Sequence, residues 1–186
     1  MRLLGKTIPS AYALLPSQQY FSLVPDPVIS FDENVGFADE WRTYWGPVIN
    51  NYLDMFSFLS GGGVARLDPA PGTTQLPAVL NPDLILDAKD FHSEFDAYSI
   101  PNSIRTVQIA GWGLKTVKGI KYNTYHFNPY YEPEFRTEGD GTVLYPSALS
   151  SNGEEYYFNL DLFGNATGHA TLLNVAPIQT VITEIL

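Results

Sequence analysis

Apolar residues recur at intervals of three and four in two stretches of the chain, and each stretch predicts an amphipathic helix. The second runs from Asp83 to Tyr98 and is closed by Pro101. The first begins at Asp39, spans about four turns, stops at Gly61-Gly62-Gly63 and carries Trp41, Tyr44, Trp45, Val48, Ile49, Tyr52, Leu53 and Phe56. Such an aromatic stripe is more typical of packing within its own domain than of a ligand site.

After Pro101 the pattern changes to short apolar runs and alternation, which are typical of strands. The predicted elements are a buried strand at 106–111, a hairpin that starts at 117–127 and returns at Asp140, a strand at 156–162 and a closing helix at 172–186. Prolines predict loop-rich segments before residue 36 and after Gly63.

Length and composition indicate a folded protein, since the 186 residues are 45% apolar and 16% charged. The net charge of −10 repels phosphate backbones, so we expect no nucleic-acid partner. No run approaches the roughly 20 apolar residues of a membrane span, so we expect no transmembrane segment. The chain has no cysteine, and its histidines, His92, His126 and His169, are scattered, so we expect no metal site.

The candidate chemistry lies in an aspartate turn and a later histidine. Asp140 stands between Gly139 and Gly141, where an aspartate commonly caps the backbone of its own turn, and His169 follows Gly168 in a loop. An acid followed by a histidine beyond the next strand is the order of an α/β-hydrolase triad, in which the carboxylate orients the imidazole. No Gly-x-Ser-x-Gly occurs in the chain, so the sequence predicts acid and base without the nucleophile.

These motifs resemble those of the lecithin:cholesterol acyltransferase-like lipases and acyltransferases, a branch of the α/β-hydrolases. Ile109 to Thr116 is similar to the family's strand and Gly-x-Gly-x-x-Thr loop, Gly139 to Val143 to its acid motif, and Gly168-His169 to its histidine. The segment from Pro9 to Pro16 resembles the one that follows the nucleophile-bearing helix. The likeness covers most of the chain, closely from about Ile104 onward, and the acid motif with its spacing to the histidine is the most specific part.

The resemblance implies the C-terminal portion of an α/β-hydrolase sheet with a mainly helical cap insertion. Residues 1–36 would follow the missing nucleophile region, 37–100 would form the cap or lid, and 101–186 would form the C-terminal core with the acid and histidine loops. By the same resemblance Asp140 is the triad acid and His169 the general base, with no metal. We expect no organic cofactor either, because Thr116 replaces the third glycine of a dinucleotide loop.

The sequence therefore predicts part of a serine acyl-ester hydrolase (lipase or esterase) or acyltransferase that acts on a hydrophobic ester or lipid. The family's nucleophile and oxyanion donors lie upstream of Met1, which implies a truncated reading frame with an internal start. The open alternatives are a non-catalytic, hydrolase-derived binding module and one half of a split enzyme completed by a second chain.

Overall fold

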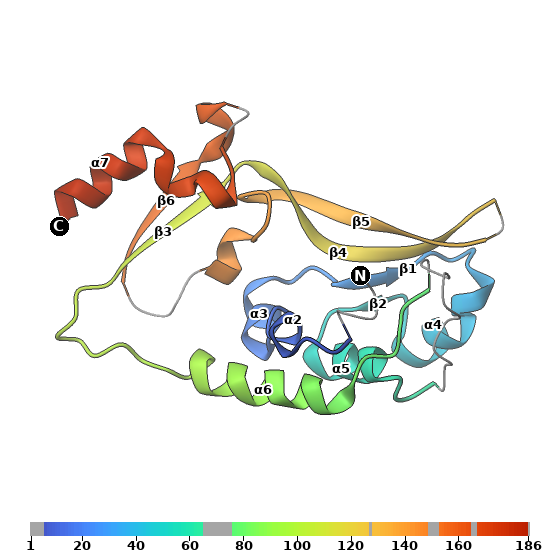
Figure 1. Ribbon diagram of the computed structural model, residues 1–186. Coiled ribbons are helices and arrows are strands. Elements are labelled where there is room, and N and C mark those ends of the chain that lie inside the picture. The colour runs from blue at the N-terminus through green and yellow to red at the C-terminus, as the bar shows by residue number, and fades with distance from the viewer. Residues whose placement is uncertain (1–5, 65–75, 127, 149–152, 165–166, 186) are drawn as a thin grey trace. The chain divides into compact units, whose positions relative to one another are not determined.

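The computed structural model describes residues 6–64, 76–126, 128–148, 153–164 and 167–185 (Figure 1). The chain divides into two compact units. The first comprises Met1–Ala97 and Gly119–Glu134, and the second comprises Tyr98–Lys118 and Phe135–Leu186. Helices accompany a mixed sheet and a parallel strand pair, which confirms the predicted α/β class.

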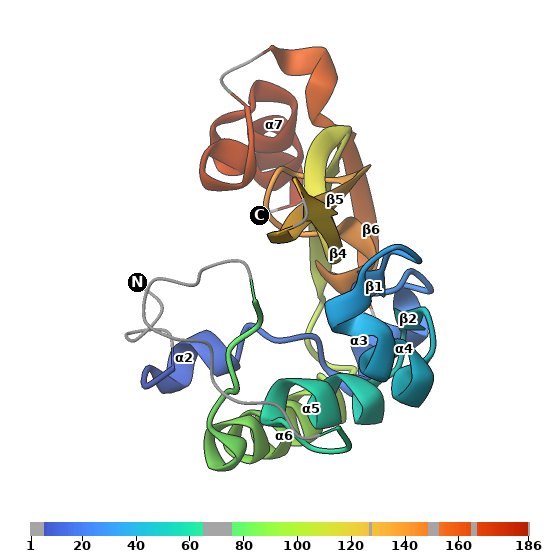
Figure 2. The ribbon, with the colours of Figure 1, turned by 90° about the vertical axis from the view of Figure 1, so that its right-hand side faces the viewer.

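The first unit contains most of a small mixed sheet in the strand order β2-β1-β4-β5, and the parts of β4 and β5 outside Gly119–Glu134 belong to the second unit. Its strands are β1 (Ile29–Phe31), β2 (Val48–Ile49), β4 (Leu114–Tyr125) and β5 (Asn128–Gly139). β1 pairs antiparallel with β2 and parallel with β4. The helices are α2 (Pro9–Tyr12), α3 (Gln18–Leu23), α4 (Asp39–Trp45), α5 (Tyr52–Ser60) and α6 (Pro82–Asp96). Figure 2 shows α5 and α6 side by side, as their contacts require.

An aromatic cluster forms the core of the first unit, and Phe58 of α5 lies at its centre with none of its surface exposed. The Phe58 ring centroid lies 5.6 Å from Phe31, 5.5 Å from Trp41, 5.3 Å from Trp45 and 6.2 Å from Tyr122. Most of these pairs are edge-on or tilted, the arrangements that aromatic quadrupoles favour. The aromatic residues at the core of the predicted stripe therefore pack within their own unit.

The prediction of one four-turn helix from Asp39 is wrong, because the chain breaks after α4. Gly46 ends that helix with a φ of 82°, and Pro47 has no N–H to continue it. The next two residues form β2, and α5 starts afresh where the Asn51 side chain accepts a hydrogen bond from the Asp54 N–H at 2.9 Å. The apolar spacing persists across the break because β2 is itself apolar.

The other helix prediction in the first unit is confirmed, since α6 occupies most of the stretch from Asp83 to Tyr98. The N-terminal prolines limit α2 and α3 to four and six residues, as expected of a loop-rich segment. The sequence pattern did not indicate β1, which lies in that segment. Much of the proline-rich loop predicted after Gly63 lies outside the described residues.

The second unit contains the parallel pair β3 (Val107–Trp112) and β6 (Glu154–Asn159), in register from Val107↔Glu154 to Trp112↔Asn159. Just before β3, the Arg105 guanidinium donates two hydrogen bonds to the Glu154 carboxylate, from Nε to Oε1 at 2.8 Å and from Nη2 to Oε2 at 3.0 Å. The predicted strands are confirmed, but the second ends earlier than expected. Its predicted last residues belong to the 3-10 turn Leu160–Phe163.

Helical segments cover one face of this strand pair. They are the 3-10 turns Leu160–Phe163 and His169–Asn174 and the helix α7 (Ala176–Ile185), and a further 3-10 turn spans Tyr145–Ala148. Leu160, Val175 and Ile178 form the buried core, packed against Ile109 and Phe158 of the strands. The predicted closing helix is confirmed, with Pro177 near its start. Within the described ranges, no helix has the length and apolarity needed to cross a membrane.

We expect Phe58→Ala to destabilise the first unit by about 3–5 kcal/mol, because it removes a fully buried ring from the centre of the aromatic cluster. Leu53→Ala is the matched control, since Leu53 lies on the same helix with 75% of its surface exposed, and it should change stability by at most about 0.5 kcal/mol. Urea unfolding followed by tryptophan fluorescence measures both. Equal effects of the two variants would contradict the proposed core.

The Asp32 carboxyl gives the first unit a pH-dependent contact with β4. The Asn34 N–H, and then the Lys121 ammonium 3.1 Å away, hold the pKa of Asp32 below its ordinary value. A lowered folded-state pKa contributes stability above the unfolded pKa, and this contribution is lost as the pH falls through the folded value.

We therefore expect Asp32→Asn to cost less than about 1 kcal/mol near neutral pH, since both side chains of the pair are partly exposed. The difference from wild type should shrink as the pH falls below about 4. Urea unfolding of both proteins across this range measures it. A difference that stays constant into strong acid would contradict the assignment.

Candidate active site

The candidate site begins in the turn that follows β5, where Asp140 has only 6% of its surface exposed. The Asp140 N–H donates to the Val143 carbonyl oxygen at 3.1 Å. Its carboxylate oxygen Oδ1 accepts hydrogen bonds from the backbone N–H groups of Thr142 at 3.0 Å and Val143 at 2.9 Å. Asp140 therefore caps its own turn, as the sequence around it suggested.

The second carboxylate oxygen faces His169. Asp140 Oδ2 lies 2.8 Å from His169 Nδ1, and the His169 backbone N–H donates to the Asp140 carbonyl oxygen at 2.9 Å. An ionised carboxylate only accepts hydrogen bonds, so opposite it Nδ1 carries the proton, and in a neutral imidazole the lone pair is then on Nε2. The two residues thus form a hydrogen-bonded acid and base, 29 positions apart in sequence.

The base is accessible while the acid is not. The His169 side chain is 52% exposed and that of Asp140 is 8% exposed. Among the described residues, no hydrogen-bond partner is assigned to His169 Nε2. An imidazole held in this way can take a proton at Nε2 while the buried carboxylate stabilises the resulting cation.

Two glycines, Gly139 and Gly141, allow the turn to form, whereas Gly168 before the histidine is not required as glycine. Gly141 has a φ of 93°, a conformation in which a side chain would be strained. A Cβ on Gly139 would collide with the Thr116 hydroxyl and lie 2.6 Å from the Val143 carbonyl oxygen. Gly168 is different, because its φ of 172° is ordinary extended backbone, and a Cβ there would lie 3.5 Å from the nearest atom.

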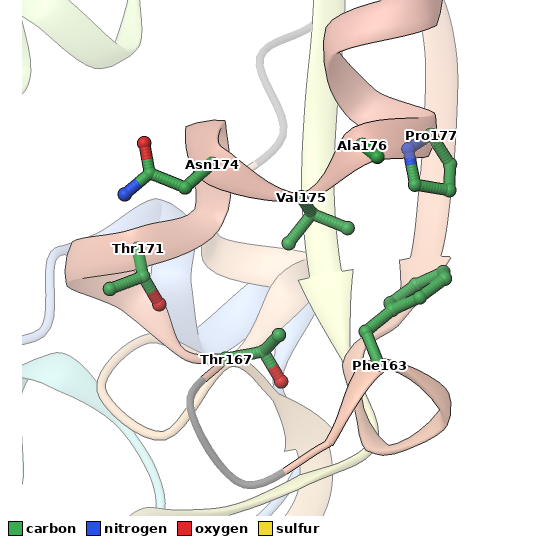
Figure 3. A pocket seen from close by; sticks show the side chains of 7 residues that line it. All are labelled: Phe163, Thr167, Thr171, Asn174, Val175, Ala176 and Pro177. Atoms are coloured by element: carbon green, nitrogen blue, oxygen red, sulfur yellow. The ribbon is translucent and has the colours of Figure 1, made fainter.

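A pocket of about 470 Å³ lies beside the histidine loop (Figure 3). It is lined by Phe163, Thr167, Thr171, Asn174, Val175, Ala176 and Pro177. Figure 3 shows Val175 projecting from the link between the last 3-10 turn and α7 toward the space beside Thr167 and Phe163. Thr167 and Thr171 stand two residues before and after His169, which is not itself among the lining residues. The walls are mainly apolar, with the Asn174 amide at one side.

The serines Ser10, Ser17, Ser60 and Ser147 have surroundings unlike those of a nucleophile elbow, and Ser10 lies in the short helix α2. Ser17 caps α3 by accepting from the Tyr20 N–H, and the Ser60 and Ser147 hydroxyls donate to nearby carbonyl oxygens. In the part of the chain that the structure describes, the only non-glycine residue with a positive φ is His126, so no serine occupies a strained nucleophile elbow there.

The other two histidines, to which the sequence assigns no role, belong to the first unit. His92 is on α6, and His126 lies in the turn between β4 and β5. Across the described ranges, no group of three or more histidine and acidic side chains could hold a metal ion. In the sequence, Thr116 stood out only as part of a motif. In the structure its buried hydroxyl accepts the Gly141 backbone N–H of the Asp140 turn.

The chain has no significant match among protein-family models, curated proteins or solved structures. The family resemblance therefore stays a prediction. Its support is the set of motifs and the geometry of Asp140 and His169.

We expect Gly139→Ala to destabilise the second unit by about 1–3 kcal/mol, because the new methyl group meets the Thr116 hydroxyl and the Val143 carbonyl. Gly168→Ala makes the same change next to His169 in extended backbone, where the new methyl group meets only ordinary van der Waals contacts, and should cost at most about 0.5 kcal/mol. Urea unfolding followed by circular dichroism compares them. If Gly139→Ala is the milder variant, the packing of the acid turn is different from that described.

Proposed function

We propose that this chain supplies the acid and the general base of a serine acyl-ester hydrolase or acyltransferase. The observation that carries the proposal is the 2.8 Å contact between the buried Asp140 Oδ2 and Nδ1 of His169, whose side chain is 52% exposed. The nucleophilic serine comes from protein outside these 186 residues, because the sequence contains no Gly-x-Ser-x-Gly.

In the proposed reaction, His169 Nε2 takes the serine hydroxyl proton as the serine oxygen attacks the ester carbonyl. Asp140 holds the ring orientation and stabilises the imidazolium. The imidazolium then protonates the departing alcohol, and an acyl-serine remains. In the second step His169 removes a proton from water, for hydrolysis, or from an acceptor alcohol, for transfer, as its oxygen attacks the acyl carbonyl. The imidazolium then returns a proton to the departing serine oxygen. The net reaction needs neither an oxidant nor a reductant.

The strand pair of the second unit supports completion by further protein. β3 and β6 are parallel, and parallel sheets are normally larger and covered on both faces. Further strands, from a longer chain or from a second chain, would give such a sheet its ordinary size. An α/β-hydrolase sheet is one arrangement that fits, with the acid after one strand and the histidine after a later one.

A hydrophobic ester is the proposed substrate class. The pocket beside the histidine loop supports this choice, because Phe163, Val175, Ala176 and Pro177 give it apolar walls and its volume of about 470 Å³ suits a small ligand. We propose the first unit, which contains most of residues 37–100, as the cap of such an enzyme.

A non-catalytic module is the second candidate, and one observation favours it. The hydrogen bonds of Asp140 to Thr142, Val143 and His169 also stabilise the turn itself. A retained turn could thus serve folding alone in a binding protein derived from a hydrolase.

The first test is the coding sequence directly upstream of Met1. The proposal expects strands and a Gly-x-Ser-x-Gly elbow there, in frame or in an adjacent frame. A terminator and ribosome-binding site in that position, with no gene for a complementing chain nearby, would count against it. The isolated chain should show no serine labelling by fluorophosphonate and no serine-dependent turnover of p-nitrophenyl esters.

The second test uses the completed protein and its rate with a short-chain p-nitrophenyl ester. His169→Asn keeps an amide that can donate to Asp140 but has no basic nitrogen, and Asp140→Asn loses the carboxylate. Each should lower kcat by roughly 10²- to 10⁴-fold.

His126→Asn is the matched control, since asparagine tolerates the φ of 48° at that turn, and it should leave kcat unchanged. Full activity in His169→Asn would refute the assignment of the base and would leave the binding module as the better account.

A further inference from the structure

We propose that Thr116 is a positioning residue for the Asp140 and His169 pair, acting on the peptide group that joins Asp140 to Gly141. Its catalytic meaning rests on the proposed function. The contact itself can be tested without any catalysis.

The Thr116 hydroxyl is completely buried and has a partner on each side. It donates its proton to the Leu114 carbonyl oxygen at 2.9 Å, within β4. The hydroxyl oxygen accepts the Gly141 backbone N–H at 2.8 Å. Because the hydroxyl hydrogen is already used, the oxygen is oriented as an acceptor toward the acid turn.

The Gly141 N–H belongs to the same planar peptide group as the Asp140 carbonyl, and the two point in opposite directions across a trans peptide. On one side the N–H is bound by Thr116, and on the other the carbonyl oxygen accepts the His169 N–H at 2.9 Å. Rotation of this peptide group would break both bonds. Thr116 therefore fixes the orientation of the Asp140 carbonyl group, which accepts the hydrogen bond from the His169 backbone N–H.

Thr116 accepts the one N–H group of the turn from Asp140 to Val143 that is not bonded within the turn itself. The N–H groups of Thr142 and Val143 go to Asp140 Oδ1, and the Asp140 N–H goes to the Val143 carbonyl. Only the Gly141 N–H reaches outside the turn, to Thr116. The Gly139 position lacks a side chain, which is what lets the Thr116 hydroxyl approach.

The test compares four proteins by NMR: wild type, Thr116→Val, Thr116→Ser and Thr142→Val. Valine removes the hydroxyl at nearly constant shape, and serine restores it. Thr142→Val is the matched control, because Thr142 is exposed in the same turn and, among the described residues, only its backbone N–H is used. The readouts are the hydrogen exchange of the Gly141 and His169 amides and the tautomer of the His169 ring.

We expect wild type, Thr116→Ser and Thr142→Val to keep His169 in the Nδ1–H tautomer with slow exchange at both amides. In Thr116→Val, exchange at Gly141 and His169 should rise at least about tenfold relative to the β3 and β6 amides, and the ring should populate both tautomers. A general loss of stability would raise exchange throughout the second unit and would not mix the tautomers of the remaining folded protein.

A folded Thr116→Val protein with wild-type exchange and tautomer would overturn the proposal. If that variant does not fold, the wild-type protein still decides, since a Gly141 amide that exchanges as fast as in an unfolded chain overturns it and a protected one supports it. Neither outcome depends on turnover. Failure here is thus distinct from failure of the proposed function, which would appear as full activity in His169→Asn.

Discussion

The hydrogen bonding of one buried carboxylate controls the geometry of the second unit's site. Asp140 Oδ1 is held by the N–H groups of its own turn, and Oδ2 faces His169. Because a carboxylate is planar, fixing one oxygen restricts the direction of the other. The interactions that close the turn are therefore the same ones that aim the acid at the base, so the stability of the turn and the geometry of the site cannot be varied independently.

The candidate site combines a local contact, which the sequence could indicate, with a non-local one, which it could not. A capped aspartate turn is a local event, determined by Asp140 and its neighbouring glycines, and the histidine follows at a distance that one intervening strand can span. The contact between the two side chains is not local, because it needs the backbone bond from His169 to the Asp140 carbonyl. Thr116 was beyond sequence reasoning for the same reason, since its partner Gly141 lies 25 positions away.

Secondary structure was predictable from the sequence where the spacing of apolar residues and the positions of glycine and proline pointed to the same element boundaries. They agreed for α6 and α7, and for the long hairpin of β4 and β5. They disagreed at Gly46-Pro47, where apolar spacing favoured a continuous helix and the local backbone chemistry ended it. β1 has three residues, too few for a visible period, and its pairing with residues near 48 and 120 is entirely tertiary.

The path of the chain through its two units has a practical consequence. The first unit is built from residues 1–97 and 119–134, and the second from 98–118 and 135–186, so the backbone passes between them three times. Two of those passages are the strands of a single hairpin. No terminal deletion can therefore isolate either unit whole, and a gene fragment that ends at residue 118 or 134 would cut through β4 or β5. Separating the units requires closing the 119–134 excursion with a short loop, which would turn a discontinuous domain into a contiguous one.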